Sequence, residues 1–148
     1  MLKESVIVET VCNLLIEKKF KIEYRSNTNQ HGYDIIASKE NETNKIELYI
    51  EAKGATSSRK DSANYGHTFS NSQIRVHIAM ALFKSAEALC IKKNGTEIFC
   101  GIALPDNQPH KNILNIIKQF ILKSGIGLFW VKEDGTVEIE PESFLQQR

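Results

Sequence analysis

Apolar and polar positions alternate along this chain with two periods, one typical of helices and the other typical of strands. Apolar side chains recur at helical spacing over 3–19, over 71–92 and from Pro109 to Gly125. Strand patterns occupy the stretches between and after these helices: 20–25, 33–38, 45–53, 97–104, 126–132 and 136–139. The order αβββαβαβ predicts an α/β fold, a three-layer sandwich with a central mixed sheet.

The length and composition fit a single domain over residues 1–148. Of the 148 residues, 41% are hydrophobic and 25% are charged, which is ordinary for a globular domain. The formal net charge is only +1, so composition gives no argument for nucleic acid, and any basic surface must come from local clusters. No segment resembles a secretion signal or a membrane span, so we expect a cytoplasmic protein with no membrane partner.

The three cysteines, Cys12, Cys90 and Cys100, each lie in an apolar stretch and are widely spaced. An odd number of scattered cysteines is not typical of a disulfide framework or a zinc site. We therefore expect buried free thiols in a reducing compartment.

The candidate chemistry lies at the ends of two neighbouring strands. Asp34 stands at the head of one strand, and the next strand ends with Glu51 and Lys53, directly before Gly54. Because side chains alternate along a strand, Glu51 and Lys53 point to one face, and an antiparallel return brings Asp34 alongside them. Two carboxylates and an ammonium at a strand end can hold a hard divalent cation and a water beside a phosphodiester. The alternative is a solvated strand face, where alternating charges are common.

In this context the chain resembles the PD-(D/E)xK nuclease superfamily, the restriction-endonuclease-like fold shared by Holliday junction resolvases and Mrr-type enzymes. Asp34 matches the motif aspartate, Glu51 the acidic residue and Lys53 the lysine, although Tyr33 stands where Pro is usual. The family core has the order αβββαβ, which nearly the whole chain follows. The resemblance implies that Asp34 and Glu51, with the Ala52 carbonyl, bind Mg²⁺, for which Mn²⁺ substitutes, and that Lys53 orients the attacking water.

The family often adds an acidic residue from its first helix, and two candidates are present. At about 100° per residue, Glu4 falls within the apolar stripe of the first helix, whereas Glu9 falls on the opposite side. A carboxylate within an apolar stripe is costly unless it is paired, so Glu4 is the preferred extra metal ligand or contact of Lys53, and Glu9 is the alternative. An acid in the first helical turn also suits the helix dipole without any metal.

Polar side chains form a narrow stripe on the helix that follows Lys53. Gln73, His77 and Lys84 lie on this stripe at helical spacing. Superfamily members often use a Gln or Lys from this helix, so Gln73, at the start of the helix, is a candidate catalytic residue. His77 and Lys84 are candidates for contact with nucleic acid, with an ordinary solvated face as the alternative.

A long polar loop over 54–69 separates Lys53 from this helix. Loops of this length in a compact domain are commonly functional. Ser57, Ser58, Arg59 and Lys60 carry hydroxyls and two cations that could clamp a phosphate backbone, the alternative being a solvent-exposed loop with no ligand.

These residues predict a Mg²⁺-dependent DNA endonuclease, that is, a phosphodiester hydrolase. A catalytically inactive nucleic-acid-binding or regulatory domain on the same fold is the alternative, and a chance motif on an unrelated α/β protein is the third reading. The sequence does not distinguish double-stranded, branched or single-stranded DNA, or RNA, as the partner. A two-fold pair would place two sites on one duplex, so geometry suggests a homodimer.

Overall fold

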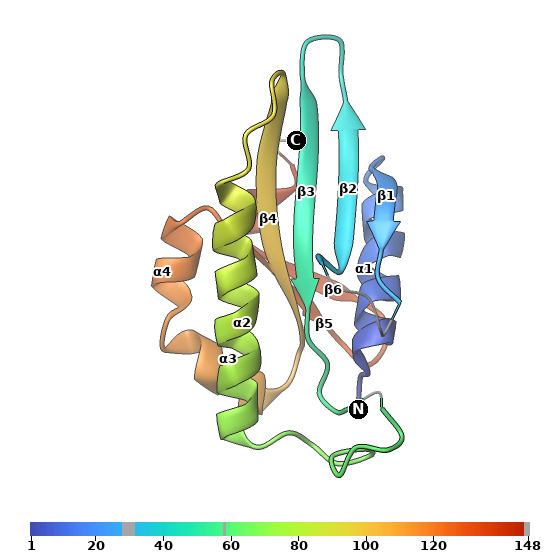
Figure 1. The fold of residues 1–148 in the computed structure, drawn as a ribbon, viewed down its shortest axis with the longest axis vertical. Helices are drawn as coiled ribbons and strands as arrows, with labels where there is room; N and C mark the ends of the chain where they lie inside the picture. The colour runs from blue at the N-terminus through green and yellow to red at the C-terminus, as the bar shows by residue number, and fades with distance from the viewer. Residues whose placement is uncertain (28–31, 58, 147–148) are drawn as a thin grey trace.

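A computed structural model describes residues 1–27, 32–57 and 59–146, and it shows one mixed sheet covered by helices (Figure 1). In chain order the elements are α1 (Glu4–Glu17), β1 (Lys21–Arg25), β2 (Ile35–Glu40), β3 (Lys45–Ala52), α2 (Asn71–Leu89), β4 (Thr96–Pro105), α3 (Gln108–Asn115), α4 (Lys118–Lys123), β5 (Gly127–Val131), β6 (Val137–Glu140) and the short 3-10 helix η1 (Glu142–Phe144).

The six strands lie in the order β1-β2-β3-β4-β5-β6. The pairs β3–β4 and β4–β5 are parallel, and the other three pairs are antiparallel. The connection between each parallel pair contains a helix, because parallel neighbours need a crossover. The predicted α/β class, the mixed sheet and the order αβββαβ over the first part of the chain are confirmed.

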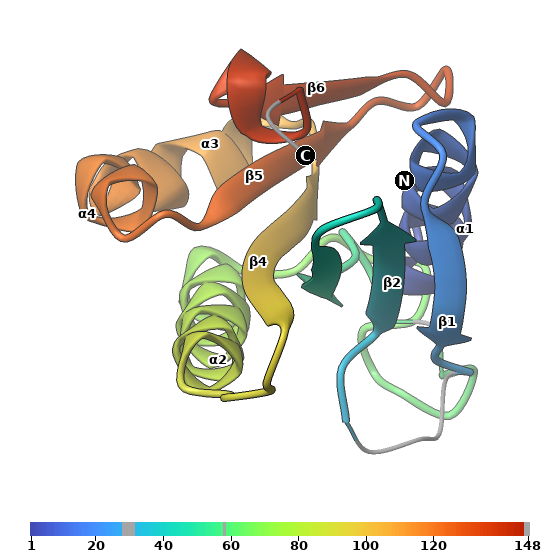
Figure 2. The ribbon, with the colours of Figure 1, turned by 90° about the horizontal axis from the view of Figure 1, so that it is seen from above.

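Two apolar clusters separate the sheet from the helices on its two sides, which gives three layers (Figure 2). On one face, α1 packs against residues that include Ile35, Leu48 and Ile50. On the other face, α2 packs against Tyr49 and Ile102, together with side chains from α3, α4 and β5. None of the helices in these described ranges is both long enough and apolar enough to cross a membrane.

Strand β3 is buried on both faces, and its alternation decides where the polar residues point. Leu48 and Ile50 face α1, whereas Tyr49 faces α2. Glu47 and Glu51 share the parity of Tyr49, so they also lie on the α2 side of the sheet. Glu47, Tyr49 and Glu51 are only 7%, 5% and 3% exposed, so the solvated-face alternative is wrong for this strand.

Three local expectations are corrected by the structure. The helix expected from Pro109 to Gly125 is two helices, because Ile117 takes φ −118° and ψ 7° and interrupts it. The adjacent β-branched Ile116 and Ile117 weaken the local helical preference. The strand expected at 33–38 is β2, which begins two residues later at Ile35. Cys12 and Cys100 are buried free thiols as expected, but Cys90 is exposed because it lies at the end of α2.

Candidate functional site

Glu51 and Lys53 lie at the end of β3, and Asp34 directly precedes β2. The end of β3 lies beside the start of β2 (Figure 1). The antiparallel register pairs Ile35 with Ile50, which places Asp34 next to Glu51. The Asp34 carboxylate is 8% exposed and accepts two hydrogen bonds, at 2.9 Å from the Ser26 hydroxyl and at 2.8 Å from the Ala52 backbone N–H. Each of its oxygens therefore keeps capacity for another partner.

The Glu51 carboxylate is the most deeply buried group of the site. Its Oε1 lies 2.7 Å from the Lys53 Nζ and 3.3 Å from the Lys84 Nζ. Its Oε2 is buried and has no hydrogen-bond partner among residues 1–27, 32–57 and 59–146. Burial, followed by the negative charge of Asp34, raises the pKa of Glu51, while Lys53 and Lys84 oppose this rise. A buried carboxylate oxygen without a partner is costly, so Oε2 is open to a cation or a donor.

Lys53 remains charged in this site. Burial favours loss of its proton, but Glu51, Glu4 and Asp34 outweigh that effect and raise the pKa of Lys53 above its ordinary value. A lysine acts as a base only when its pKa is lowered. The arrangement therefore suits Lys53 to hydrogen bonding and to stabilising negative charge, and it does not suit Lys53 to accepting a proton.

Glu4, at the start of α1, lies near the same site, because the backbone at the start of α1 packs closely against the residues that follow Lys53. A Cβ on Gly54 would lie only 2.6 Å from the Glu4 backbone nitrogen, so the glycine after Lys53 permits this contact. The Ala55 N–H donates to the Leu2 carbonyl at 2.8 Å. Burial, together with the charges of Asp34 and Glu51, raises the pKa of Glu4 to about 7, against the opposing effect of Lys53. Of the two helix acids, Glu4 is near the site and Glu9 is exposed.

The raised pKa of Glu4 predicts that the free energy of unfolding falls as pH rises. Between its ordinary value of 4.5 and about 7, Glu4 holds its proton in the folded chain but not in the unfolded chain, so unfolding becomes easier across this range. Glu4→Gln should therefore raise the free energy of unfolding at pH 8 by up to about 3 kcal/mol and leave it nearly unchanged at pH 4.5. Chemical denaturation at several pH values, without divalent metal, measures this difference.

Glu9→Gln is the matched control, since it changes an exposed acid on the same helix. We expect its stability to follow that of the wild type at every pH. Equal effects of the two substitutions would show that Glu4 does not carry the pH dependence.

The stripe on α2 divides into residues with different surroundings. Lys84 contacts Glu51 and also donates to the Gly32 carbonyl, so it is part of the site. Gln73 forms a capping box with Ser70, in which its Oε1 accepts from the Ser70 N–H at 2.8 Å. Within the described ranges no hydrogen bond or ion pair joins Gln73 to Asp34, Glu51 or Lys53. No hydrogen bond or ion pair therefore supports the predicted catalytic role of Gln73, which stays a prediction.

His77 lies beside the site without a direct bond to it. Its ring packs edge-on against Phe69, with 4.5 Å between ring centroids, and its Nδ1 is buried with no hydrogen-bond partner among the described residues. Burial, and to a lesser degree the charge of Lys53, lowers the pKa of His77. The ring is therefore neutral at neutral pH, which gives it no charge for a phosphate contact.

Arg59 and Lys60 of the loop are exposed, and Ser57 is partly buried. Arg59 forms an ion pair with Asp61 at 3.0 Å, in which both side chains are more than 70% exposed. This pairing leaves Lys60 as the cation of the loop that has no ion pair in the described part of the chain. The Ser57 hydroxyl accepts from the Arg59 N–H at 3.2 Å, which bends the loop locally. Ser58 lies outside the described residues.

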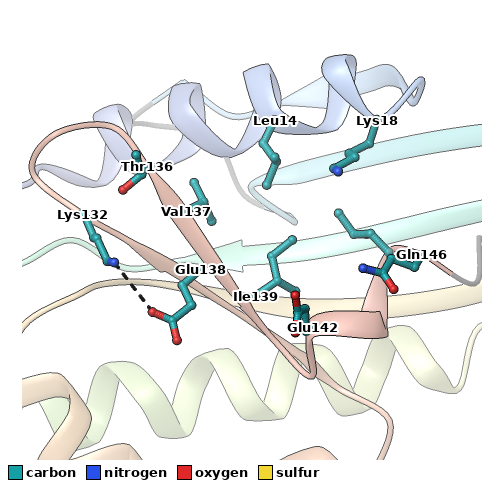
Figure 3. A pocket seen from close by; sticks show the side chains of 10 residues that line it. Leu14, Lys18, Lys132, Thr136, Val137, Glu138, Ile139, Glu142 and Gln146 are labelled. Carbon is teal, nitrogen blue, oxygen red and sulfur yellow. Dashed lines mark ion pairs between the residues drawn. The ribbon is translucent and has the colours of Figure 1, made fainter.

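Two hollows differ in their relation to this site. Glu4 and Ser26 line an open hollow of about 360 Å³, whose other lining residues are Ser5, Val8 and Asn27. A second hollow, of about 650 Å³, lies between α1, β6 and η1 (Figure 3). Its lining includes Leu14, Lys18 and Ile139 but none of the candidate residues, so this hollow is not the candidate site.

The donor set suits a hard cation, although it is not a complete metal site. Among residues 1–27, 32–57 and 59–146, no three His, Cys, Asp or Glu side chains are placed to hold a metal ion. Mg²⁺ is commonly held by one or two carboxylates, with waters and substrate phosphates as its other ligands. Asp34 and Glu51 fit that pattern, because both have unfilled oxygen capacity and Glu51 Oε2 has no partner.

One residue that shapes the site was not predicted from the sequence, and another makes a contact that was not predicted. Ser26 donates to Asp34, and Lys84 reaches Glu51 from α2, which covers the same face of the sheet. Ser26 stands in a polar loop that offers no periodic signal. The spacing of Lys84 predicts the face of the helix on which it lies, and we expected it to contact nucleic acid there. The spacing does not predict the direction of its long side chain, so the contact with Glu51 was not foreseen.

Comparison with protein-family models gives no match, and comparison with curated protein sequences gives none. Two solved structures align with most of the chain. A crystal structure of an XisH family protein from Nostoc punctiforme is 16% identical and has a TM-score of 0.49, covering 90% of this chain and 96% of that chain. A crystal structure of an fdxN element excision controlling factor protein from Anabaena variabilis is 15% identical and has a TM-score of 0.46, with the same coverage of both chains. Likeness at this level assigns neither a family nor a function to this chain.

Proposed function

We propose that this chain is a Mg²⁺-dependent DNA endonuclease of the PD-(D/E)xK type. The observation that supports this proposal most is the Glu51 carboxylate, which is 3% exposed and lies against Lys53 and Asp34, and which has one oxygen without a partner in the described part of the chain. A buried acid with a vacant oxygen is destabilising for the fold alone. Binding of a cation to this oxygen during function would explain why the fold retains a carboxylate that destabilises it.

Each side chain has a defined part in this proposal. Asp34 and Glu51 would hold Mg²⁺ through their oxygens, with the Ala52 carbonyl as the further ligand implied by the motif. When bound, the ion makes a coordinated water more acidic and offsets the charge of the transferring phosphoryl group. Lys53, charged in this setting, donates hydrogen bonds that orient the water and stabilise the phosphate charge. Glu4, which is electrostatically coupled to Lys53, Asp34 and Glu51, would be a further metal ligand or a contact of Lys53.

A second function, nucleic-acid binding without cleavage, is favoured by one observation. Glu51 Oε1 is already shared by the two ammonium groups of Lys53 and Lys84. Those two cations compete with a metal ion for the same carboxylate. If this competition is not overcome, the site would neutralise phosphate charge but would not activate water.

Cleavage assays with several nucleic acids separate these functions. Supercoiled plasmid, linear duplex, single-stranded DNA, a four-way junction and an RNA duplex are each incubated with the protein in Mg²⁺, in Mn²⁺ and in chelator. The proposal expects metal-dependent cleavage of at least one DNA. Tight binding with no cleavage in either metal would support the second function, and neither binding nor cleavage would contradict both.

A further inference from the structure

An open hollow lies between α2 and the segment that precedes β2. Its volume is about 520 Å³, and it is lined by Tyr33, Phe83, Ala86, Glu87, Cys90 and Ile91. Helix α2 packs against β3 and β4, whereas Tyr33 comes two residues before β2, the next strand of the sheet (Figure 1). Two segments that are far apart in the sequence therefore form its walls, and its volume is in the range of sites for small ligands.

Both walls of the hollow adjoin residues of the candidate site. Tyr33 directly precedes the aspartate of the site, and Phe83 directly precedes Lys84. The Lys84 ammonium lies 3.3 Å from the Glu51 carboxylate and donates to the Gly32 carbonyl, so it joins the two walls to the acidic end of β3. A phosphate bound at that end would have the hollow next to it.

The two walls carry aromatic rings that are open to a ligand. The Tyr33 ring packs edge-on against Tyr49, with 4.9 Å between ring centroids, and it remains partly exposed. The Phe83 side chain is 66% exposed. Aromatic side chains beside a phosphate site serve as platforms for nucleobases, because every base has a π face. A base in the hollow would also remove apolar ring surface from water.

Glu87 is the charged residue in the lining of the hollow. At about 100° per residue it lies between Phe83 and Lys84 around α2, and it forms no ion pair within the part of the chain that the structure describes. Burial, followed by the charge of Glu87, raises the pKa of Tyr33, so the carboxylate acts on the Tyr33 hydroxyl. A carboxylate repels phosphate but accepts a hydrogen bond from the amino group of a base. The hollow therefore suits a base better than a second phosphate.

Stacking on these rings requires a base whose face is free. In a duplex each base lies between its neighbours, and its removal from the stack is costly, whereas a single strand exposes its base faces. We propose that the hollow lined by Tyr33 and Phe83 binds an unpaired DNA base next to the phosphate at the candidate site. This inference rests on the proposed function and narrows its substrate class to single-stranded or locally unpaired DNA.

Binding of a short single strand and of the matching duplex tests the proposal. Fluorescence anisotropy in chelator, at one ionic strength, measures both affinities without metal-dependent cleavage. We expect the wild type to bind the single strand more tightly than the duplex. Tyr33→Ala and Phe83→Ala should each weaken single-strand binding by about 5- to 100-fold and change duplex binding by less than about twofold.

Phe120→Ala is the control, since Phe120 is an exposed aromatic residue on α4, outside the hollow. We expect this variant to bind both DNAs like the wild type. Phe83→Ala should fold, because Phe83 is exposed, so this variant decides the outcome if circular dichroism shows that Tyr33→Ala is unfolded. A wild type that binds the duplex at least as tightly, or a folded Phe83→Ala that binds the single strand like the wild type, would overturn the proposal.

Cleavage of the same single strand in Mg²⁺ separates failure of this inference from failure of the proposed function. If single-strand binding depends on Tyr33 and Phe83 but the wild type cleaves no DNA, the nuclease proposal fails and the base site stands. If the wild type cleaves DNA but both folded variants bind the single strand normally, the base site alone is overturned.

The identity of the base tests the contact with Glu87. Oligodeoxycytidine presents amino groups that donate to a carboxylate, whereas oligothymidine presents an acceptor oxygen at the same position. We expect the wild type to bind the deoxycytidine strand several-fold more tightly. Glu87→Gln should lose this preference, because its amide can donate as well as accept. Equal affinity of the wild type for the two strands would overturn the contact between Glu87 and the base.

Discussion

Lys53→Met is expected to reduce metal-dependent DNA cleavage by about 10²- to 10³-fold. Lys53 is the ammonium nearest the buried Glu51 carboxylate, at 2.7 Å, and its pKa is raised, so it brings a full charge to the site. Removal of one preorganised donor to a developing anion typically has an effect of this size. The measurement is the initial rate of plasmid nicking in Mg²⁺ at equal concentrations of folded protein.

The fold should tolerate this change, because Lys84 still lies 3.3 Å from Glu51. Lys92→Met is the control, since it removes an exposed lysine that has no ion pair in the described ranges. We expect Lys92→Met to cleave at the wild-type rate. If Lys53→Met also cleaved at that rate, Lys53 would have no part in the chemistry.

Asp34→Asn is expected to remove the stabilisation that Mg²⁺ gives to the folded protein. A cation that binds only the folded state adds about 2.7 kcal/mol at about 100 times its dissociation constant, which raises the melting temperature by several degrees. Asp34 supplies a charged carboxylate to that site, and an amide is a much weaker ligand for Mg²⁺. Thermal melts of the wild type and the variant, with and without Mg²⁺ or Mn²⁺, measure the difference.

The variant should fold, because an asparagine can keep both contacts of the native side chain. Its carbonyl oxygen can accept from the Ala52 N–H, and its amide can donate to the Ser26 hydroxyl. Asp134→Asn serves as the control, since it changes an exposed aspartate in the hairpin between β5 and β6. If Asp34→Asn and the wild type gained the same stability from Mg²⁺, the ion would not bind at Asp34.

The sequence pattern was sufficient for features that depend on periodicity. The period of two in β3 places Glu51 on the same face as Tyr49. The short polar turn before Lys45 predicts that β2 and β3 pair antiparallel, as they do. The stripe of α1 likewise points to Glu4 instead of Glu9 as the acid near the site. These inferences hold because the direction of a side chain close to the backbone is fixed by the secondary structure.

The features that were missed depend on competition between partners or on long side chains. The side-chain Oε1 of Gln73 accepts from the Ser70 N–H in a capping box, which is a local and favourable contact, and the catalytic role of Gln73 stays a prediction. Lys84 reaches Glu51 through four flexible methylenes, which no spacing rule describes. The exposed Cys90 and the break at Ile117 depend on how the helices end against their neighbours, which is a tertiary effect.

Cleavage of supercoiled plasmid by the wild type and by Glu51→Gln tests most directly whether this chain is a Mg²⁺-dependent nuclease. Glu51 is the acid whose buried oxygen, without a partner among the described residues, supports the metal proposal, and Glu97→Gln supplies a control at an exposed acid on β4. We expect nicking in Mg²⁺ by the wild type and by Glu97→Gln, and none above background by a folded Glu51→Gln. Equal nicking by all three proteins, or nicking by none of them in either metal, would contradict this expectation.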